Sequence, residues 1–413
     1  MKNLLSSGII FAAASFLTTL VHYGFQMIIS RQLGQTPGEF GLMNSTITFI
    51  GFLGLPLAIA SQTVTHYIAR FHFSQDSERL HGLLAGCRRF LLHITLAGSV
   101  LAIVLIKPLG DFFHLPRASL TLIALLCVLG GLWGSYVNAL CQGLAWFKRL
   151  AGIGLLAAIL RVLFGWQTTK IWPVAEWAVA ASLVMLLANL ILLFWKKDFP
   201  GRAQTVISPW DRDFVRYLVV SAACVLGSSC FTQGDLLVAK RYFPAAQLDA
   251  YAAAGLLARG LPTVVGPLLA VLFTYRSSRQ HGDALPEQLK LLGLYAGTLL
   301  FGATCLFFLR EFCLHLLHRN DPTASDMIPP LAATMVFVGL LQALGLWALA
   351  SRWLKISLLY GVLGVGYWFA LLFLGQSPAD LLRVLPLAAG GAFAVIFIVW
   401  LIAMRGGKIK PDE

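Results

Sequence analysis

Charged side chains inside long apolar segments are the residues of this sequence best suited to chemistry. Three lie well inside such segments: Arg161, Asp235 and Arg259. An arginine presents a planar fork of N–H donors that grips phosphate oxygens in pairs, and a desolvated carboxylate can bind a proton or Na⁺. We therefore predict that Arg259 and Arg161 bind an anionic substrate and that Asp235 binds a coupling ion.

Each of these residues also has a structural interpretation. Asp235 and Arg259 belong to neighbouring predicted helices, so they can simply pair with each other. The long stem of Arg161 can instead carry its guanidinium to the outer lipid headgroups near Trp166. The sequence leaves both interpretations open.

Polar residues on the first, second and fourth apolar segments form a second group of candidates. Two pairs are spaced four residues apart and so share a helix face. We predict that these side chains line a hydrophilic substrate cavity, the alternative being hydrogen bonds between helices. The substrate-binding candidates of this group are His22, Gln26, Gln62, His66 and Asn138.

The elements that must position these residues are membrane helices. The chain has 413 residues, of which 58% are hydrophobic and only 12% charged, so the bilayer is its natural solvent. Apolar windows of about 17 to 25 residues, long enough to cross a bilayer, recur from end to end. The predicted spans are 8–30, 43–69, 90–106, 120–142, 150–169, 174–195, 214–239, 251–274, 289–309, 327–350, 354–374 and 382–404.

The basic residues predict the orientation of these spans. Of 31 Lys and Arg residues, 20 lie in one alternating set of loops and tails and 9 in the opposite set, the other two being Arg161 and Arg259. Because retained cytoplasmic loops collect positive charge, both termini are predicted to face the cytoplasm of a multi-pass inner-membrane protein. The net charge of +13 then reflects topology and gives no reason to expect nucleic acid.

The sequence offers little for catalysis, metals or cofactors. No loop predicted to lie outside carries a nucleophile triad or paired carboxylates, so an enzyme is not expected. The seven cysteines show no metal-ligand spacing. His315, His318 and Glu311 could imitate a metal cluster, but solvated interfacial side chains explain them better. We predict no metal, no cofactor and no catalytic residue.

A weak internal repeat predicts two halves. The longest inside loop, 196–216, separates six predicted helices from six. In each half a helix ends on a basic residue, Arg31 or Lys240, and an acid, Glu39 or Asp249, opens the next helix. Many transporters consist of such repeats with the binding site between them. We therefore predict an all-α integral membrane protein of about twelve transmembrane helices, with halves at 1–200 and 201–413 around a central cavity.

Four stretches carry a resemblance to a known family. "RQLGQTPGEFGL", "GLPLAIA", "NALCQGLAWFKRLA" and "DLLVAKRYFPAAQLDAYAAA" resemble the polysaccharide transporter, or oligosaccharide flippase, family of the multidrug/oligosaccharidyl-lipid/polysaccharide exporter (MOP) superfamily. The match runs from about residue 8 to 275. It departs from the family pattern at Met43, where an aromatic residue is common, and at Asp249, where a glycine-rich pattern is usual.

The resemblance implies alternating access and flipping of a polyprenyl-pyrophosphate-linked oligosaccharide across the cytoplasmic membrane. Its partners would be the lipid-linked glycan, membrane lipids and H⁺ or Na⁺ as the coupling ion. Two alternatives stay open. One is a cation-coupled small-molecule exporter of the same superfamily, and the other, from a different class, is a membrane glycosyl polymerase or ligase.

Overall fold

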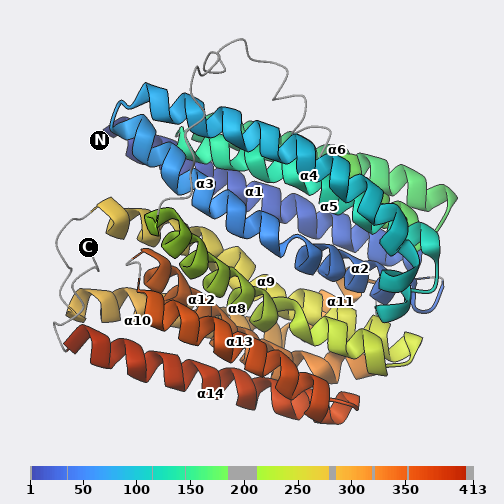
Figure 1. Ribbon diagram of the computed structural model, residues 1–413. Helices are drawn as coiled ribbons and strands as arrows, with labels where there is room; N and C mark the ends of the chain where they lie inside the picture. Colours follow the sequence, from blue (N-terminus) through green and yellow to red (C-terminus); the bar gives the residue numbers. More distant parts are fainter. Residues whose placement is uncertain are drawn as a thin grey trace. The chain divides into compact units, whose positions relative to one another are not determined.

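The computed structural model describes residues 2–34, 36–113, 115–144, 146–184, 212–278, 285–318, 321–350 and 353–405. These residues form helices and no strand. The helices are α1 (Lys2–Leu33), α2 (Glu39–Leu53), α3 (Leu55–Phe73), α4 (Ser77–Phe112), α5 (Ala118–Gly143), α6 (Phe147–Ile171), α8 (Arg212–Tyr242), α9 (Ala245–Ser278), α10 (Leu285–Phe308), α11 (Arg310–Leu316), α12 (Pro322–Ala350), α13 (Leu354–Leu374) and α14 (Pro378–Arg405). The predicted all-α membrane fold is confirmed (Figure 1).

The helices follow the predicted spans with some corrections. By length and composition, seven helices of the described residues can cross a membrane, or nine if each of two bent pairs is one span. The predicted span 174–195 is described only up to residue 184, as a short apolar helix, Ala175–Val184, and residues 185–195 lie outside the described residues. The predicted span 90–106 forms the middle of a much longer helix, α4.

One predicted span is broken by a bend, and another ends at one. The span 43–69 consists of α2 and α3, which meet at an angle of 50° at Gly54. The break follows from Pro56, which lacks an N–H and stands at the start of α3. The span 289–309 ends where α10 meets α11 at 76°. The bend at Gly54 is not visible in the apolar periodicity, because hydrophobic residues continue through it, whereas the charged residues Arg310 and Glu311 stand at the second bend.

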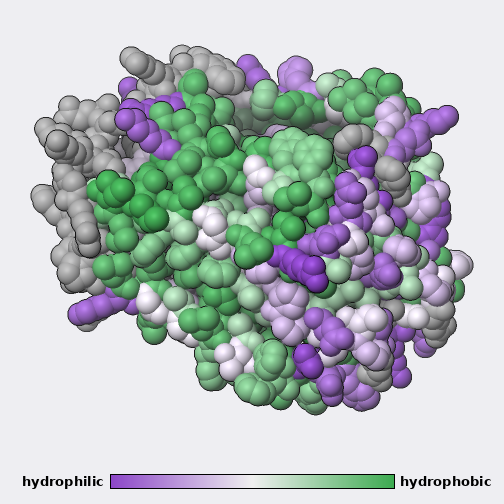
Figure 2. Space-filling view, turned by 90° about the horizontal axis from the view of Figure 1, so that it is seen from below, coloured by the Kyte–Doolittle hydropathy of each residue, from purple (hydrophilic) through white to green (hydrophobic). Residues whose placement is uncertain are grey.

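Apolar side chains on the helix surfaces explain why the chain needs a bilayer. On α4, Leu96 is 71% exposed and Ile103 is 72% exposed, and their neighbours are similar. Hydrophobic residues also cover much of the face seen in Figure 2, whereas hydrophilic residues gather toward one end of it. Large exposed apolar areas of this kind are typical of lipid-facing surfaces.

The chain divides into two compact units. The first comprises residues 1–25 and 49–218, and in it α5 packs against both α3 and α4. The second comprises residues 26–48 and 219–413, and in it α12 packs against α9, α10 and α14 (Figure 1). Residues 26–48 thus pack with the second unit although they precede most of the first. The halves 1–200 and 201–413 and a cavity between them stay a prediction.

Glycines allow a close contact between α8 and α13 in the second unit. A Cβ atom added to Gly364 would lie 2.5 Å from the Cα atom of Gly227, and one added to Gly361 would lie 3.0 Å from the carbonyl oxygen of Ala223. The ring of Tyr360 covers Gly227 from α13. The backbone of α8, which carries Asp235, is therefore fixed against α13.

Candidate functional site

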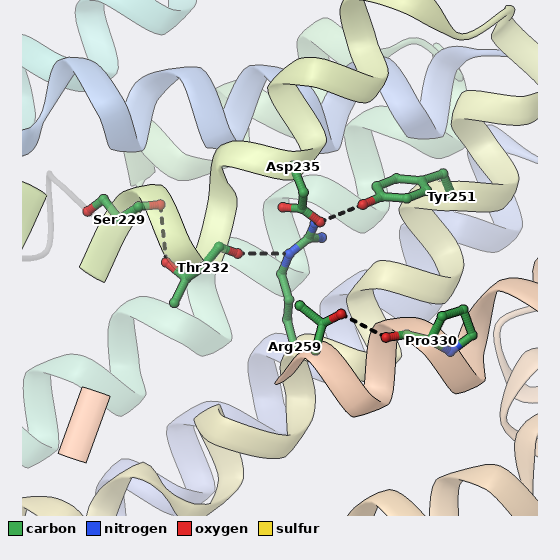
Figure 3. Close-up of polar contacts among 7 residues, drawn as sticks. Ser229, Thr232, Asp235, Tyr251, Arg259 and Pro330 are labelled. Atoms are coloured by element: carbon green, nitrogen blue, oxygen red, sulfur yellow. Dashed lines mark hydrogen bonds and ion pairs between the residues drawn. The ribbon is translucent and has the colours of Figure 1, made fainter. Parts of the chain in front are cut away.

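Asp235 and Arg259 form a buried ion pair in the second unit. Arg259 Nη2 lies 2.6 Å from Asp235 Oδ2, and the hydroxyl of Tyr251 donates a hydrogen bond of 2.7 Å to the same oxygen. The Asp235 side chain is fully buried, and that of Arg259 is 19% exposed. Figure 3 shows the carboxylate of Asp235 between Tyr251 and Arg259. Asp235 and Arg259 are therefore paired with each other, as the structural interpretation of the sequence predicted.

The helix α9 places both partners of Asp235 on one face. Tyr251, Gly255 and Arg259 follow one another at intervals of four residues, so they line up along the helix. A Cβ atom at Gly255 would lie 2.8 Å from Arg259 Nη1, so the guanidinium lies across the space that this glycine leaves. Arg259 Nε then donates to the Thr232 carbonyl oxygen of α8 over 3.1 Å.

Two polar atoms of this cluster have no hydrogen-bond partner among the described residues. They are Asp235 Oδ1 and the hydroxyl oxygen of Tyr367, both buried. Tyr367 comes from α13 and is near enough to Asp235 and Arg259 to interact with them electrostatically. A buried carboxylate oxygen without a donor is costly, and a proton or a cation on that oxygen would remove the cost.

Arg161 and His22 form a second cluster, in the first unit. Arg161 Nη1 lies 3.5 Å from His22 Nδ1, and the guanidinium carbon lies 4.3 Å from the centre of the Phe25 ring. Arg161 Nε is buried and has no hydrogen-bond partner among the described residues. No carboxylate of the described chain lies within ion-pair distance of this arginine, which instead relies on the ring of Phe25 and on His22.

Gly165 shapes the surroundings of Arg161. It stands four residues further along α6, and a Cβ atom there would lie 2.5 Å from Phe25 Cε2. The glycine therefore lets the ring of Phe25 approach α6 closely enough to meet the guanidinium. Arg161 thus contacts His22 and Phe25 of α1. The alternative in which its guanidinium reaches the outer headgroups near Trp166 stays a prediction.

The other predicted cavity residues belong to α1, α3 and α5. His66 stacks on Tyr217, with ring centres 4.4 Å apart, and Gln62, one turn earlier on α3, is exposed. Asn138 is half-buried on α5. Gln26 belongs to the second compact unit, and its Oε1 atom is buried without a hydrogen-bond partner in the described chain. Their role in substrate binding stays a prediction.

Sequence reasoning missed two residues of the Asp235 cluster, Tyr251 and Tyr367. The spacing of Tyr251 eight residues before Arg259 was a usable signal, because two helical turns bring both side chains to one face. Nothing in the sequence marks Tyr367, which reaches the cluster only through tertiary packing. Among the described residues no group of three His, Cys, Asp or Glu side chains could hold a metal ion.

Comparison with known proteins defines the fold. No family model matches the sequence, and no curated protein matches it. Among solved structures, an inward-facing multidrug resistance MATE family transporter of the MOP superfamily is similar, with a TM-score of 0.66 and 14% identity over 97% of this chain and 98% of that one. An outward-facing transporter of the same description gives a TM-score of 0.60, with 13% identity over 98% and 97% of the two chains.

A third similar structure is a MOP superfamily transporter from Pyrococcus furiosus, described by the reverse polarity of its binding pocket. The TM-score is 0.59 and the identity 14%, over 98% of this chain and 96% of that one. The chain therefore has the fold of MOP superfamily transporters, over nearly its whole length. At this level of identity the comparison establishes the architecture of a multi-pass membrane protein, and the cargo must be argued from the residues.

Proposed function

We propose that this protein is an ion-coupled transporter of the inner membrane that works by alternating access. The observation that carries the proposal is the fully buried carboxylate of Asp235, which pairs with Arg259 inside two membrane helices and keeps one oxygen without a donor. Buried charges in membrane helices are costly and are typical of ion pathways and coupling sites. The neighbours of the same fold are described as transporters in inward-facing and outward-facing conformations.

Asp235 is the coupling residue of the proposed transporter. Binding of H⁺ or Na⁺ at Oδ1 weakens the attraction of the carboxylate for Arg259, because it neutralises the charge that holds the guanidinium. The Arg259 side chain can then shift from the Thr232 carbonyl. An ion that binds one conformation more tightly than the other changes their populations, which is the requirement for coupling.

Arg161 is the better substrate-binding candidate of the two arginines. Arg259 already uses Nη2 and Nε on partners within the protein. Arg161 has no carboxylate partner in the described chain, so its charge is available to an anionic group of the cargo. A phosphate fits this role, because guanidinium binds two of its oxygens at once. His22 would add a further contact next to it.

The proposed cargo is the polyprenyl-pyrophosphate-linked oligosaccharide that the family resemblance implies. Its pyrophosphate supplies the anion for Arg161, and the polar residues Gln26, Gln62, His66 and Asn138 would contact sugar hydroxyls. A polar glycan cannot cross hydrocarbon unaided, so such a lining is a physical requirement. Membrane lipids would hold the polyprenyl chain.

A cation-coupled small-molecule exporter is the second candidate. It is favoured by the structural neighbours, several of which are described as multidrug resistance or MATE transporters. An accumulation assay in a host without its own drug pumps separates the two candidates. If expression lowers the accumulation of several cationic dyes, and a glycan-export mutant is not complemented, the lipid-linked cargo is wrong.

Asp235→Asn tests the coupling proposal, because it keeps the shape of the side chain and removes its charge. In proteoliposomes with an imposed ion gradient, we expect transport by Asp235→Asn to lose its dependence on the gradient. Asp380→Asn is a matched control, since Asp380 is an exposed acid that binds only its neighbour Ser377 in the described structure. Full gradient dependence in Asp235→Asn would contradict the coupling role.

The cytoplasmic location of both termini is also part of the proposal, and it rests on the distribution of Lys and Arg. Reporter fusions after Glu413 and within residues 200–212 are expected to give a cytoplasmic signal. A periplasmic signal from either fusion would reverse the assignment of inside and outside.

A further inference from the structure

The carboxylate of Asp249 joins two helix N-termini that are distant in the sequence. Asp249 Oδ2 accepts a hydrogen bond from the backbone N–H of Gly38 over 2.9 Å, and Oδ1 accepts one from Gly41 over 2.6 Å. These donors stand at the N-terminus of α2, while Asp249 belongs to the first turns of α9. The Asp249 side chain is therefore an N-cap supplied from another helix.

The sequence is adapted to this joint by glycine at both donor positions. Gly38 has a φ of +90°, a backbone conformation that residues with a side chain rarely adopt. A Cβ atom there would lie 2.8 Å from Ala245 Cβ. A Cβ atom at Gly41 would lie 2.7 Å from Leu248 Cγ and 3.0 Å from Asp249 Oδ1. The backbone of α2 thus meets the start of α9 with no room for side chains.

The joint lies within the second compact unit, at the helix ends that the distribution of basic residues assigns to the outer face. Its bonds run from backbone donors to one carboxylate and are charge-assisted. Asp249 is 5% exposed, so the carboxylate is largely protected from water. Such a contact is strong while it is formed, yet it can be broken without unfolding either helix.

We propose that Asp249 is a latch that holds the N-termini of α2 and α9 together in the closed state of the outer face. In the outward-open state this carboxylate releases Gly38 and Gly41, and water takes its place at the N-terminus of α2. The assignment of the latch to a transport cycle rests on the proposed function. The opening and closing of the latch itself does not depend on that function, because it is tested without cargo or an ion gradient.

Distance measurement between spin labels tests the latch. Labels at Thr36→Cys and Gln247→Cys, both exposed positions that flank the joint, are placed in the full chain after replacement of the seven native cysteines. In lipid nanodiscs we expect one short distance to dominate. In Asp249→Asn the amide keeps one acceptor oxygen and loses the charge, so the ratio of long to short distances should rise about tenfold.

Gly41→Ala tests the same joint from the other side and is needed if Asp249→Asn does not fold. Its methyl group must displace Leu248 or the carboxylate, so the same shift to long distances is expected. Asp380→Asn is the control, because Asp380 is bonded within its own turn, and it should leave the distribution unchanged. If Asp249→Asn and Gly41→Ala both keep the wild-type distribution, Asp249 is a permanent cap and the latch is wrong.

Discussion

Arg259 and Arg161 are the same residue type in similar positions inside membrane helices, but they differ in what neutralises them. Arg259 bonds to a buried carboxylate and a carbonyl oxygen. Arg161 rests on the ring of Phe25 beside His22, with one nitrogen unsatisfied in the described structure. The counterion, rather than the arginine itself, therefore distinguishes an arginine that is neutralised within the protein from the one that we propose binds an anion.

Removal of Arg259 should have the largest effect on stability. Arg259→Ala leaves Asp235 buried without its cation, which is expected to lower the free energy of unfolding by about 3–5 kcal/mol. Unfolding in detergent, followed by tryptophan fluorescence, measures the loss. The double variant Asp235→Asn/Arg259→Gln removes both charges and should recover a large part of it. Equal instability of the single and double variants would mean that the ion pair is not the source.

Removal of the Arg161 charge should affect export strongly and stability little, in contrast to removal of Arg259. Arg161→Gln leaves no unpaired carboxylate among the described residues, so its free energy of unfolding should change by less than about 1 kcal/mol. If Arg161 binds the proposed lipid-linked glycan, export should fall at least tenfold, because one charge-assisted contact to that cargo is lost. Arg161→Lys should restore export only in part. If Arg161→Gln is as unstable as Arg259→Ala, the contrast between the two arginines fails.

Tyr251→Phe should weaken the Asp235 cluster without breaking its ion pair. The change removes the hydroxyl that donates to Asp235 Oδ2 and leaves the ion pair intact. We expect a loss of about 1.5–3 kcal/mol in the free energy of unfolding, the range for hydrogen bonds to charged groups. Tyr242→Phe is a control, because that hydroxyl donates to the neutral Leu372 carbonyl oxygen. If Tyr242→Phe loses more stability than Tyr251→Phe, the loss in Tyr251→Phe does not come from the hydrogen bond to the charged Asp235.

Gly255→Ala should give the smallest loss of stability among the changes at the Asp235 cluster. Its methyl group would lie 2.8 Å from Arg259 Nη1, so the guanidinium must shift and its bond to Asp235 must lengthen. A loss of about 0.5–1.5 kcal/mol is expected after the gain in helix propensity is included. Gly293→Ala is the matched control, because nothing lies within 4 Å of a Cβ atom there, and it should be neutral or stabilising.

Sequence reasoning reached the membrane fold because apolar spans and basic loops are local signals. It also selected Asp235, Arg259, Arg161 and His22, since charged and polar residues are rare in such spans. It did not decide which arginine is paired, because that depends on how α8 and α9 are rotated against each other. The bond from Asp249 to Gly41 was beyond it too, since the two residues are 208 positions apart.

The glycine contact between α8 and α13 has a consequence for how variation in this protein should be interpreted. Gly227, Gly361 and Gly364 have no chemical groups to offer, yet a single added methyl group at any of them would collide with backbone or with Tyr360. A saturation-mutagenesis library should therefore show these positions to be as intolerant as Asp235. Their intolerance would then reflect how closely the backbones of α8 and α13 pack where they cross, and not a role in transport. Measuring both the transport rate and the protein abundance of each variant would distinguish these two causes.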